Sequence, residues 1–492
     1  MGISCRAIPA GLIRCYKQSG SSKDVIAAMK FAALISAALL VASFSAVAQT
    51  QTVPASREQV RLTFAPVVRQ VAPAVVNIYT KRVVHAAASP MFADPFFRRF
   101  FGDVPGMTQD RVQRSLGSGV MVGGDGTVVT NHHVIKDADE VTVILSDRRE
   151  FEARVVGSDE RTDLAVVKIE SKGETFPTLT LGDSDRIEVG DIVLAIGNPF
   201  GVGQTVTQGI VSALARTNVG VADFRSFIQT DAAINPGNSG GALVDMEGRL
   251  IGINTAIFSK DGGSNGIGFA IPSALVRNVV AGISKGGKVV RAWLGASGQA
   301  VTADLAQALN LARPLGVLVN NIFKDGPAAK AGLLDGDVIV AVNGREVDDT
   351  EGLRFRLATL PVGGDAQLSV LRAGAERQVT VRLVAPPELP PRDQSEIGGR
   401  NPFSGAVIVN LNPALAEELG VNSSLTGVMV LQIHRGSIAH RLGIQPGDRI
   451  LKINDAVVAS VADAKRIVSG PSSRWSITIN RNGEIMTQVI GG

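Results

Sequence analysis

The chain has 492 residues, of which 45% are apolar and 19% are charged, and this length and composition predict about three globular domains. Its net charge of +4 comes from residues 1–48, which hold five basic residues and one acidic residue. The remaining chain is formally neutral and has no long basic run, and aromatic residues make up only 4% of the sequence, so the composition argues against a nucleic-acid partner.

The first 48 residues contain the pattern of an export signal. Met29-Lys30 gives a short positive start, the stretch Phe31 to Val47 is apolar with scattered serines, and Ala46-Val47-Ala48 fits a cleavage site. We interpret residues 1–48 as a Sec-type signal peptide region whose true start is Met29. The alternative is a membrane anchor, but the apolar run is short for a span, so we expect at most peripheral membrane association.

Cysteine usage agrees with an exported protein. Cys5 and Cys15 are the two cysteines of the chain, and both lie in the part that the signal peptidase would remove. The mature chain then has no disulfide and no cysteine-based metal site, which suits a bacterial periplasm. We expect no metal and no organic cofactor.

After the signal, Phe64 to Gln70 predicts a short helix that stops before Pro73, and Ala74 to Tyr79 predicts the first strand. The stretch Pro90 to Phe101 then carries five phenylalanines among charges and prolines. One interpretation is a hydrophobic plug on its own domain. The interpretation we favour is a contact with another subunit, because exposed apolar patches mark interfaces.

From Gly117 to Pro272, short apolar strands alternate with turn signals, which predicts a pair of β-barrels. Thr127 to Ile135 is an apolar run that contains His132 and His133, and Asp163 stands at the entrance to a further apolar strand.

Ser239 follows, with Gly237-Asn238 before it and Gly240-Gly241 after it. The glycines permit positive φ and a close backbone approach to a substrate, so the serine is a candidate nucleophile, although a plain turn is the alternative. The order His, Asp, Ser fits a two-barrel peptidase, whereas the elbow motif of an α/β-hydrolase needs its histidine after the serine.

A helix is predicted from Ser273 to Gly282, and the chain then repeats itself. Asp337 and Asn343 of the first copy recur as Asp448 and Asn454 of the second, in matching glycine-rich surroundings. This spacing indicates two modules of domain size. Between them, the proline-rich stretch that begins at Pro386 predicts a stiff linker over residues 386–402.

The blocks TNHHVI, TDLAVVKI and DAAINPGNSGGAL resemble the three catalytic blocks of the HtrA/Deg (Do-type) serine proteases. The resemblance implies that His133 is the general base, that Asp163 orients it and that Ser239 is the nucleophile. It also implies an oxyanion hole from the backbone at Gly237, Asn238 and Ser239. The family usually has Asn before its histidine; here that residue is His132, which we expect to be a neighbour with its own hydrogen bond.

The same resemblance extends to the binding regions. The segment containing Ile267, Gly268 and Phe269 matches the wall of the primary specificity pocket and has no acidic residue, which implies a small aliphatic residue before the scissile bond. Arg216 matches the arginine of a loop that senses ligand state. The aromatic stretch resembles the family loop that reaches a neighbouring active site.

Both C-terminal modules resemble PDZ domains, which bind the C-terminus of a peptide as an added strand. The carboxylate loop of the first would be Trp293-Leu294-Gly295-Ala296, with Trp293 at the mouth of the groove. Phe403-Ser404-Gly405-Ala406 would be its counterpart in the second. For the second module, a packing or assembly domain with an idle groove is an equal alternative.

We therefore expect a mainly β chain with a chymotrypsin-like double β-barrel over residues 49–288, PDZ domains over 289–385 and 403–490, and a linker between them. The expected function is an ATP-independent endopeptidase for unfolded or misfolded envelope proteins, with chaperone activity and a trimeric building block. The rival functions are a peptide-binding scaffold without catalysis, which the complete triad disfavours, and an esterase, which the position of the histidine disfavours.

Overall fold

The computed structural model describes residues 63–84, 111–170, 173–198, 203–216, 227–235, 237–257, 265–286 and 289–491. The export signal, His85 and the aromatic stretch Pro90 to Phe101 lie outside these residues. Within the described part of the chain, no helix is long and apolar enough to cross a bilayer.

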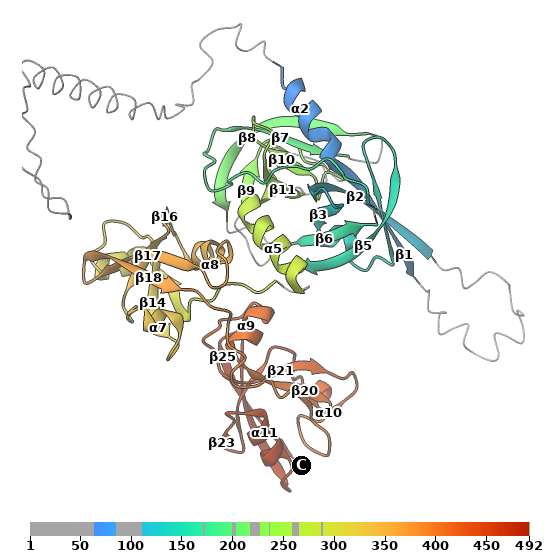
Figure 1. Cartoon of the computed structure of the whole chain (residues 1–492). Coiled ribbons are helices and arrows are strands. Elements are labelled where there is room, and N and C mark those ends of the chain that lie inside the picture. Colours follow the sequence, from blue (N-terminus) through green and yellow to red (C-terminus); the bar gives the residue numbers. More distant parts are fainter. Residues whose placement is uncertain are drawn as a thin grey trace, which may run out of the picture. The chain divides into compact units, whose positions relative to one another are not determined.

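Two closed six-stranded barrels follow one another along the chain (Figure 1). The first has the spatial order β1-β2-β3-β6-β5-β4, and the second has the order β10-β11-β12-β9-β8-β7. The strands of the first barrel are β1 Val75–Val84, β2 Arg111–Gly123, β3 Thr127–Asn131, β4 Glu140–Ile144, β5 Glu150–Asp159 and β6 Leu164–Ile169. Those of the second are β7 Ile192–Gly197, β8 Thr205–Arg216, β9 Phe227–Thr230, β10 Ala242–Val244, β11 Leu250–Ile257 and β12 Gly268–Pro272.

The barrel strands are rich in β-branched residues, which favour extended backbone, and each strand is antiparallel to its neighbours in the barrel. Strand β6, with the sequence LAVVKI, is almost completely buried, while β4 alternates buried and more accessible residues. One large apolar cluster includes side chains of both barrels, such as Val167 and Leu194. Because the barrels share this core, loops from both can converge on one site.

One helix precedes the first barrel in the chain and another follows the second barrel, and their bounds differ from the sequence prediction. Helix α2 spans Ala65–Val71 and continues into the 3₁₀ turn η2 (Ala72–Ala74), because Pro66 and Pro73 each sit in a first turn, where a missing N–H does no harm. Helix α5 spans Ser273–Gly286 and runs past Gly282, and it contacts strands of both barrels. The apolar side chains of its buried face outweigh the helix-breaking tendency of one glycine.

The first C-terminal module is a sheet in the order β13-β14-β15-β17-β18, with β16 paired to β15. Strand β13 is an edge strand, and helix α8 belongs to the same module. The elements are β13 Ala296–Ala300, α6 Ala303–Ala308, β14 Val317–Ile322, α7 Pro327–Lys330, β15 Val338–Val342, β16 Arg345–Glu346, α8 Thr350–Ala358, β17 Asp365–Arg372 and β18 Ala375–Arg382.

The second module repeats this arrangement in the order β19-β20-β21-β22-β24-β25, with β23 paired to β22. Its elements are β19 Ser395–Glu396, β20 Ala406–Leu411, α9 Pro413–Leu419, β21 Gly427–Ile433, α10 Ile438–Arg441, β22 Arg449–Ile453, β23 Ala456–Val457, α11 Val461–Val468, β24 Arg474–Arg481 and β25 Glu484–Gly491.

The prediction of a linker over residues 386–402 is corrected by this second sheet. Strand β19 lies within that segment and pairs with β20, and Ile397 belongs to the core of the second module. Composition misled the prediction, because prolines and polar residues dominate a segment in which one isoleucine supplies the packing.

The repeated aspartates have the same structural role in both modules. Asp337 accepts two hydrogen bonds from Arg372, and Asp448 accepts two from Arg481, at 2.6–2.7 Å. Each carboxylate is 1% exposed. A buried carboxylate must be paired, so the repeat seen in the sequence marks a buried ion pair that fixes the turn of each module.

Candidate active site

The structure brings His133 and Asp163 together where β3 ends and the turn from β5 leads into β6. His133 lies on the one-turn helix α4 (His132–Ile135), directly after β3, and its Nδ1 is 2.8 Å from Asp163 Oδ2. The backbone N–H of His133 also donates to Asp163 Oδ1 at 3.0 Å. Because Nδ1 is engaged and the side chain is 47% exposed, Nε2 remains available to a reacting group.

Asp163 is held in an unusual backbone conformation at the turn between β5 and β6. Its φ is +55°, and its carbonyl oxygen accepts hydrogen bonds from Asn131 Nδ2 and from the His132 N–H, both at 3.0 Å. The turn is thereby fastened to the end of β3, so the barrel itself sets the distance between the aspartate and His133.

The second barrel contributes Thr255 of β11, whose Oγ1 donates to Asp163 Oδ2 at 2.6 Å. Burial raises the pKa of Asp163, but the hydrogen bonds and charge of His133, together with the Thr255 hydroxyl, outweigh burial and hold this pKa below its ordinary value. The carboxylate is therefore ionised at neutral pH and suited to orient an imidazole.

The expectation that His132 makes its own side-chain hydrogen bond is wrong. Both ring nitrogens are buried and have no partner among the described residues. The two histidines are neighbours on one helical turn, so their rings point in different directions and only that of His133 meets Asp163. In the structure, the side chain of His133 and not that of His132 therefore contacts the carboxylate of the aspartate.

Ser239 lies in the turn before β10, and contacts with both barrels fix it. Its carbonyl accepts from the Ser118 N–H of β2 at 2.8 Å, and its Oγ donates to the Thr255 carbonyl at 3.1 Å. Gly240 has a φ of +83°, and a Cβ there would lie 2.1 Å from the Ser118 carbonyl oxygen. Only glycine fits at that position.

No hydrogen bond joins Ser239 Oγ to His133 among the described residues. The hydroxyl instead points at the Thr255 carbonyl. Thr255 thus contacts both ends of the arrangement, Ser239 through its carbonyl and Asp163 through its hydroxyl. Sequence reasoning missed this threonine, because a Thr inside an apolar strand carries no distinguishing signal.

Gly237 and Asn238 form the backbone ahead of the serine. Gly237 has a φ of +101°, and its carbonyl accepts from Ser118 Oγ at 2.6 Å. Ser118 Oγ also accepts from the Asn198 N–H at 2.9 Å, so one buried hydroxyl fastens two loops. Sequence reasoning missed Ser118 too, although its place between Gly117 and Gly119 was a usable signal of close packing.

The residues expected to wall the specificity pocket come at the start of β12. Gly268 pairs with Thr230 of β9, and a Cβ on Gly268 would lie 2.8 Å from Ile234 Cδ1. Phe269 is 3% exposed and packs against Phe227, while Ile267 is partly buried. The backbone of Arg216 ends β8 opposite Phe227, and the loop that follows it lies outside the described residues.

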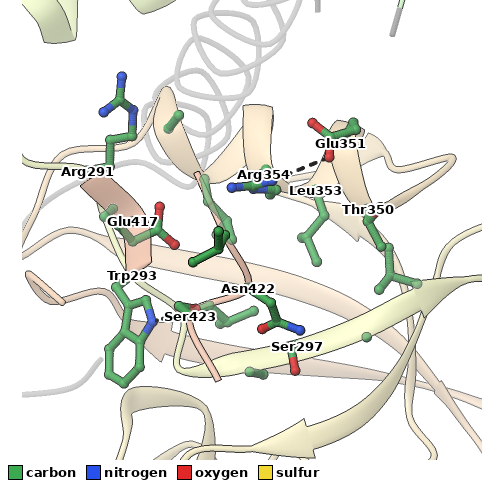
Figure 2. A pocket seen from close by; sticks show the side chains of 18 residues that line it. Arg291, Trp293, Ser297, Thr350, Glu351, Leu353, Arg354, Glu417, Asn422 and Ser423 are labelled. Carbon is green, nitrogen blue, oxygen red and sulfur yellow. Dashed lines mark hydrogen bonds and ion pairs between the residues drawn. The ribbon is translucent and has the colours of Figure 1, made fainter. Parts of the chain in front are cut away.

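The first C-terminal module has a cavity of about 250 Å³ between β13 and α8. Figure 2 shows Ser297 of β13 facing Leu353 and Thr350 of α8 across it, with Trp293 at one end. Leu294 also lines the cavity, but its side chain is 3% exposed in the module core. Gly295 has a φ of +73°, beside the indole of Trp293.

The end of this cavity near Trp293 is also lined by a segment of the second module. Figure 2 shows Glu417 and Ser423 near Trp293 and Asn422 beside Ser297, and Trp293 Nε1 donates to Ser423 Oγ at 3.2 Å. The indole ring packs edge-on against Phe323 with centroids 5.1 Å apart. Trp293 is consequently only 5% exposed.

The chemistry of the described residues is that of proton transfer through side chains. No group of three or more His, Cys, Asp or Glu side chains in this part of the chain is placed to hold a metal ion. A paired histidine and aspartate beside a serine, at the meeting of two six-stranded barrels, define a serine endopeptidase of the chymotrypsin-like class.

Comparisons with known proteins agree with this class. The trypsin-like peptidase domain matches residues 117–253, and PDZ domains match residues 293–383 and 429–481. The periplasmic serine endoprotease DegP of Escherichia coli (strain K12) is 36% identical over 470 residues, which cover 91% of this chain and 95% of that protein. A probable DegP-like endoprotease of Chlamydia muridarum is 38% identical over 444 residues, covering 87% of this chain and 88% of the relative.

A solved structure, the HtrA-type protease AlgW with a decapeptide, is 49% identical with a TM-score of 0.50, covering 66% of this chain and 99% of that chain. The chain belongs to the HtrA/DegP family of periplasmic serine endoproteases with PDZ domains. The predicted fold class and enzyme class are thereby confirmed.

Proposed function

We propose that this chain is an ATP-independent serine endopeptidase that degrades unfolded or misfolded envelope proteins in the periplasm. The observation that carries the proposal is the contact of His133 with Asp163, linked through Thr255 to the glycine-flanked Ser239. The names of the relatives support the compartment, and the signal pattern in residues 1–48 supports export.

In the proposed mechanism, Ser239 attacks the scissile carbonyl while His133 takes its proton at Nε2. Asp163 keeps the imidazole in the tautomer with hydrogen on Nδ1 and stabilises the imidazolium that forms. The same imidazolium then gives its proton to the leaving amine, and a water molecule repeats the sequence on the acyl-enzyme. The low pKa of Asp163 supports this role, because the carboxyl stays ionised throughout.

One movement precedes the chemistry. The Ser239 hydroxyl has to rotate away from the Thr255 carbonyl before it can reach the His133 ring. Such looseness in the absence of substrate is common, because catalytic hydrogen bonds tighten only when substrate is bound.

The oxyanion hole is assigned to the backbone at Gly237, Asn238 and Ser239, with the N–H groups of Gly237 and Ser239 as the donors. Preorganised donors of this kind account for about 2.7–4 kcal/mol of transition-state stabilisation each in other peptidases. Ser118 supports the assignment, because its hydroxyl fixes the Gly237 carbonyl and therefore the orientation of the turn.

Substrate choice is assigned to two regions. Ile267, Gly268 and Phe269 are proposed to wall a pocket for a small aliphatic residue, since Gly268 already packs on Ile234 and the segment offers no acidic residue. The cavity beside Trp293, Leu294 and Gly295 is proposed to bind the C-terminal residues of a substrate or activator. The similarity to the AlgW protease, whose solved structure contains a decapeptide, supports peptide binding by this chain.

Regulation and assembly are proposed by family resemblance. Arg216 would help the loop that follows it respond to ligand bound at the first PDZ domain. Such a response requires that the ligand bind the active conformation more tightly than the inactive one. A trimer, or multiples of it, would bring the aromatic stretch of one subunit to the site of another, and such an assembly can also hold unfolded chains as a chaperone.

The experiment that tests the proposal is casein hydrolysis by the mature chain from Gln49, compared with Ser239→Ala. We expect cleavage by the first and a rate at least about 10³-fold lower for the second. Equal cleavage by both would refute the role of Ser239. If neither cleaves, the assay is repeated with a C-terminal activating peptide, and continued inactivity would refute the endopeptidase proposal. If Ser239→Ala still suppresses the aggregation of unfolded proteins, the chaperone activity is independent of peptide cleavage.

A further inference from the structure

The second PDZ domain differs from the first at the edge where a PDZ domain receives its ligand. In the first domain, β13 is the last strand of its sheet and pairs only with β14 among the described strands. In the second, the equivalent strand β20 has β21 on one side and β19 on the other. Strand β19 runs antiparallel to β20, with Ser395 opposite Ile408 and Glu396 opposite Val407. This is the position and direction of an added peptide strand.

The backbone next to β19 ends at the carboxylate loop. Ile397 donates its N–H to the Ala406 carbonyl at 2.9 Å, and its own carbonyl accepts from the Gly405 N–H at 2.8 Å. The N–H of a carboxylate-loop residue thus binds an oxygen of this chain in place of the carboxylate of a peptide.

Matching hydrogen bonds show that Gly405 is the counterpart of Gly295 in the first domain. The Gly295 carbonyl accepts from the Phe323 N–H at 2.8 Å, and the Gly405 carbonyl accepts from the His434 N–H at 2.9 Å. Both glycines have positive φ, +73° and +81°. The two loops are therefore the same structural element. The strand after the second loop, β20, is paired with β19 at this edge, whereas β13 has no paired strand there among the described residues.

The side chain of Ile397 fills the apolar part of the groove. It is 3% exposed and belongs to one core cluster with Val461, Ala464 and Val468 of helix α11. Helix α11 is the counterpart of α8, which lines the cavity of the first domain. Burial removes the apolar surface of this side chain from water, so the contact favours the covered state.

Further bonds hold the covering segment on both sides of Ile397. Asn410 of β20 donates its N–H to the Arg392 carbonyl at 2.7 Å and its Nδ2 to the Pro391 carbonyl at 2.8 Å. After Ile397, the chain turns back within residues 398–402, where Asn401 Nδ2 donates to the Gly398 carbonyl at 2.8 Å. The tether is so short that the effective concentration of the segment is in the millimolar range or above.

We propose that residues 395–397 are a built-in ligand of the second PDZ domain, so that free peptide C-termini bind only the first domain in the resting chain. The inference rests on the proposed peptide-binding function of these domains. It also defines the chemistry of the covered groove, which takes an extended segment that ends in an aliphatic residue.

The test uses the chain from Gln49 with Ser239→Ala, which prevents cleavage of the probe. The probe is a labelled synthetic peptide with the sequence PPRDQSEI, that of residues 390–397, and a free C-terminal carboxylate. Calorimetry counts its sites on this chain, on the same chain with Ile397→Asp, and on a matched control with Leu389→Asp. Leu389 is an apolar residue of the same segment and is 67% exposed.

We expect one site per chain in the parent and in Leu389→Asp, and a second site in Ile397→Asp, with affinity for the second domain raised about 100-fold or more. A second site in the parent, or a folded Ile397→Asp chain that gains none, would overturn the inference. If the parent chain binds no probe, the first domain does not bind this peptide, and that part of the proposed function is refuted. A site gained by Ile397→Asp would still support a covered groove in the second domain.

Amide hydrogen exchange on the unaltered Ser239→Ala chain decides the matter if Ile397→Asp does not fold. The Ile397 and Gly405 amides are expected to exchange slowly without peptide and to stay unchanged when it is added, while exchange around Gly295 slows. Rapid exchange of Ile397 and Gly405 before peptide, or protection of both only after it, would show that the groove is open.

Discussion

Thr255 contacts both Asp163 and Ser239, and replacing it tests whether this link between the barrels positions the catalytic groups. Thr255→Val removes one hydroxyl while keeping the shape of the side chain, and Thr255→Ser keeps the hydroxyl as a matched control. Thr255 is 4% exposed, and its hydroxyl lies 2.6 Å from Asp163 Oδ2, so no water can replace it without rearrangement.

The magnitude follows from the contacts that remain. A hydrogen bond to a charged group contributes about 1.5–3 kcal/mol. Asp163 keeps two bonds from His133, and the valine methyl needs no partner, so we expect the lower end, a loss of about 1.5 kcal/mol of unfolding free energy at pH 7. If the aspartate also orients His133 less well, kcat/KM for a peptide substrate falls about tenfold, which corresponds to about 1.4 kcal/mol.

The pH dependence has a definite sign. The pKa of Asp163 is lowered in the folded chain, so its ionisation stabilises the fold above the unfolded pKa, and this stabilisation is lost as the pH falls through the folded pKa. Without the Thr255 hydroxyl the folded pKa rises towards its ordinary value. The stability difference between Thr255→Val and the parent therefore narrows as the pH falls below about 4.

The assay is urea unfolding at pH 7 and at pH 3.5, followed by fluorescence, together with peptide hydrolysis at pH 7. Thr255→Ser should restore most of both the stability and the rate. Equal values for the Val and Ser variants at pH 7, or a difference that grows on acidification, would refute the role given to this hydroxyl.

Two further substitutions test contacts that position the loops. Ser118→Ala leaves the Gly237 carbonyl and the buried N–H of Asn198 without their partner, so we expect the free energy of unfolding to fall by about 2–4 kcal/mol. We also expect kcat to fall by more than KM changes. Unchanged kinetics would contradict the role of Ser118. Asp448→Ala removes the buried partner of Arg481, so we expect the free energy of unfolding of the second PDZ domain to fall by about 2–3 kcal/mol. In thermal or urea unfolding, the transition of the peptidase domain should stay at its original midpoint. A shift of both transitions would show that the ion pair does not act on the second PDZ domain alone.

The sequence determined the fold class and the identity of the candidate residues for the reaction. Short apolar segments separated by turn residues indicate barrels, because closing such a sheet on itself buries the apolar side chains and leaves no exposed edge. The order of His133, Asp163 and Ser239 separated the two-barrel class from α/β-hydrolases. The repeat of Asp337 at Asp448 revealed two related modules, since each needs the same buried carboxylate in its turn.

Tertiary structure alone decided which partners these residues have. Thr255 and Ser118 are distant in sequence from the groups they hold. Thr255 lies in an apolar strand without a distinguishing pattern, and the glycines beside Ser118 indicate close packing but not which groups its hydroxyl binds. The His132 ring nitrogens have no hydrogen-bond partner within the described part of the chain, and a helix of one turn gives no periodicity from which this could be predicted. The sequence predicts a linker at Ile397 because no local pattern marks it as a buried residue. A single apolar side chain gives no period, and its burial depends on a groove formed by β20 and α11, which only the folded domain brings together.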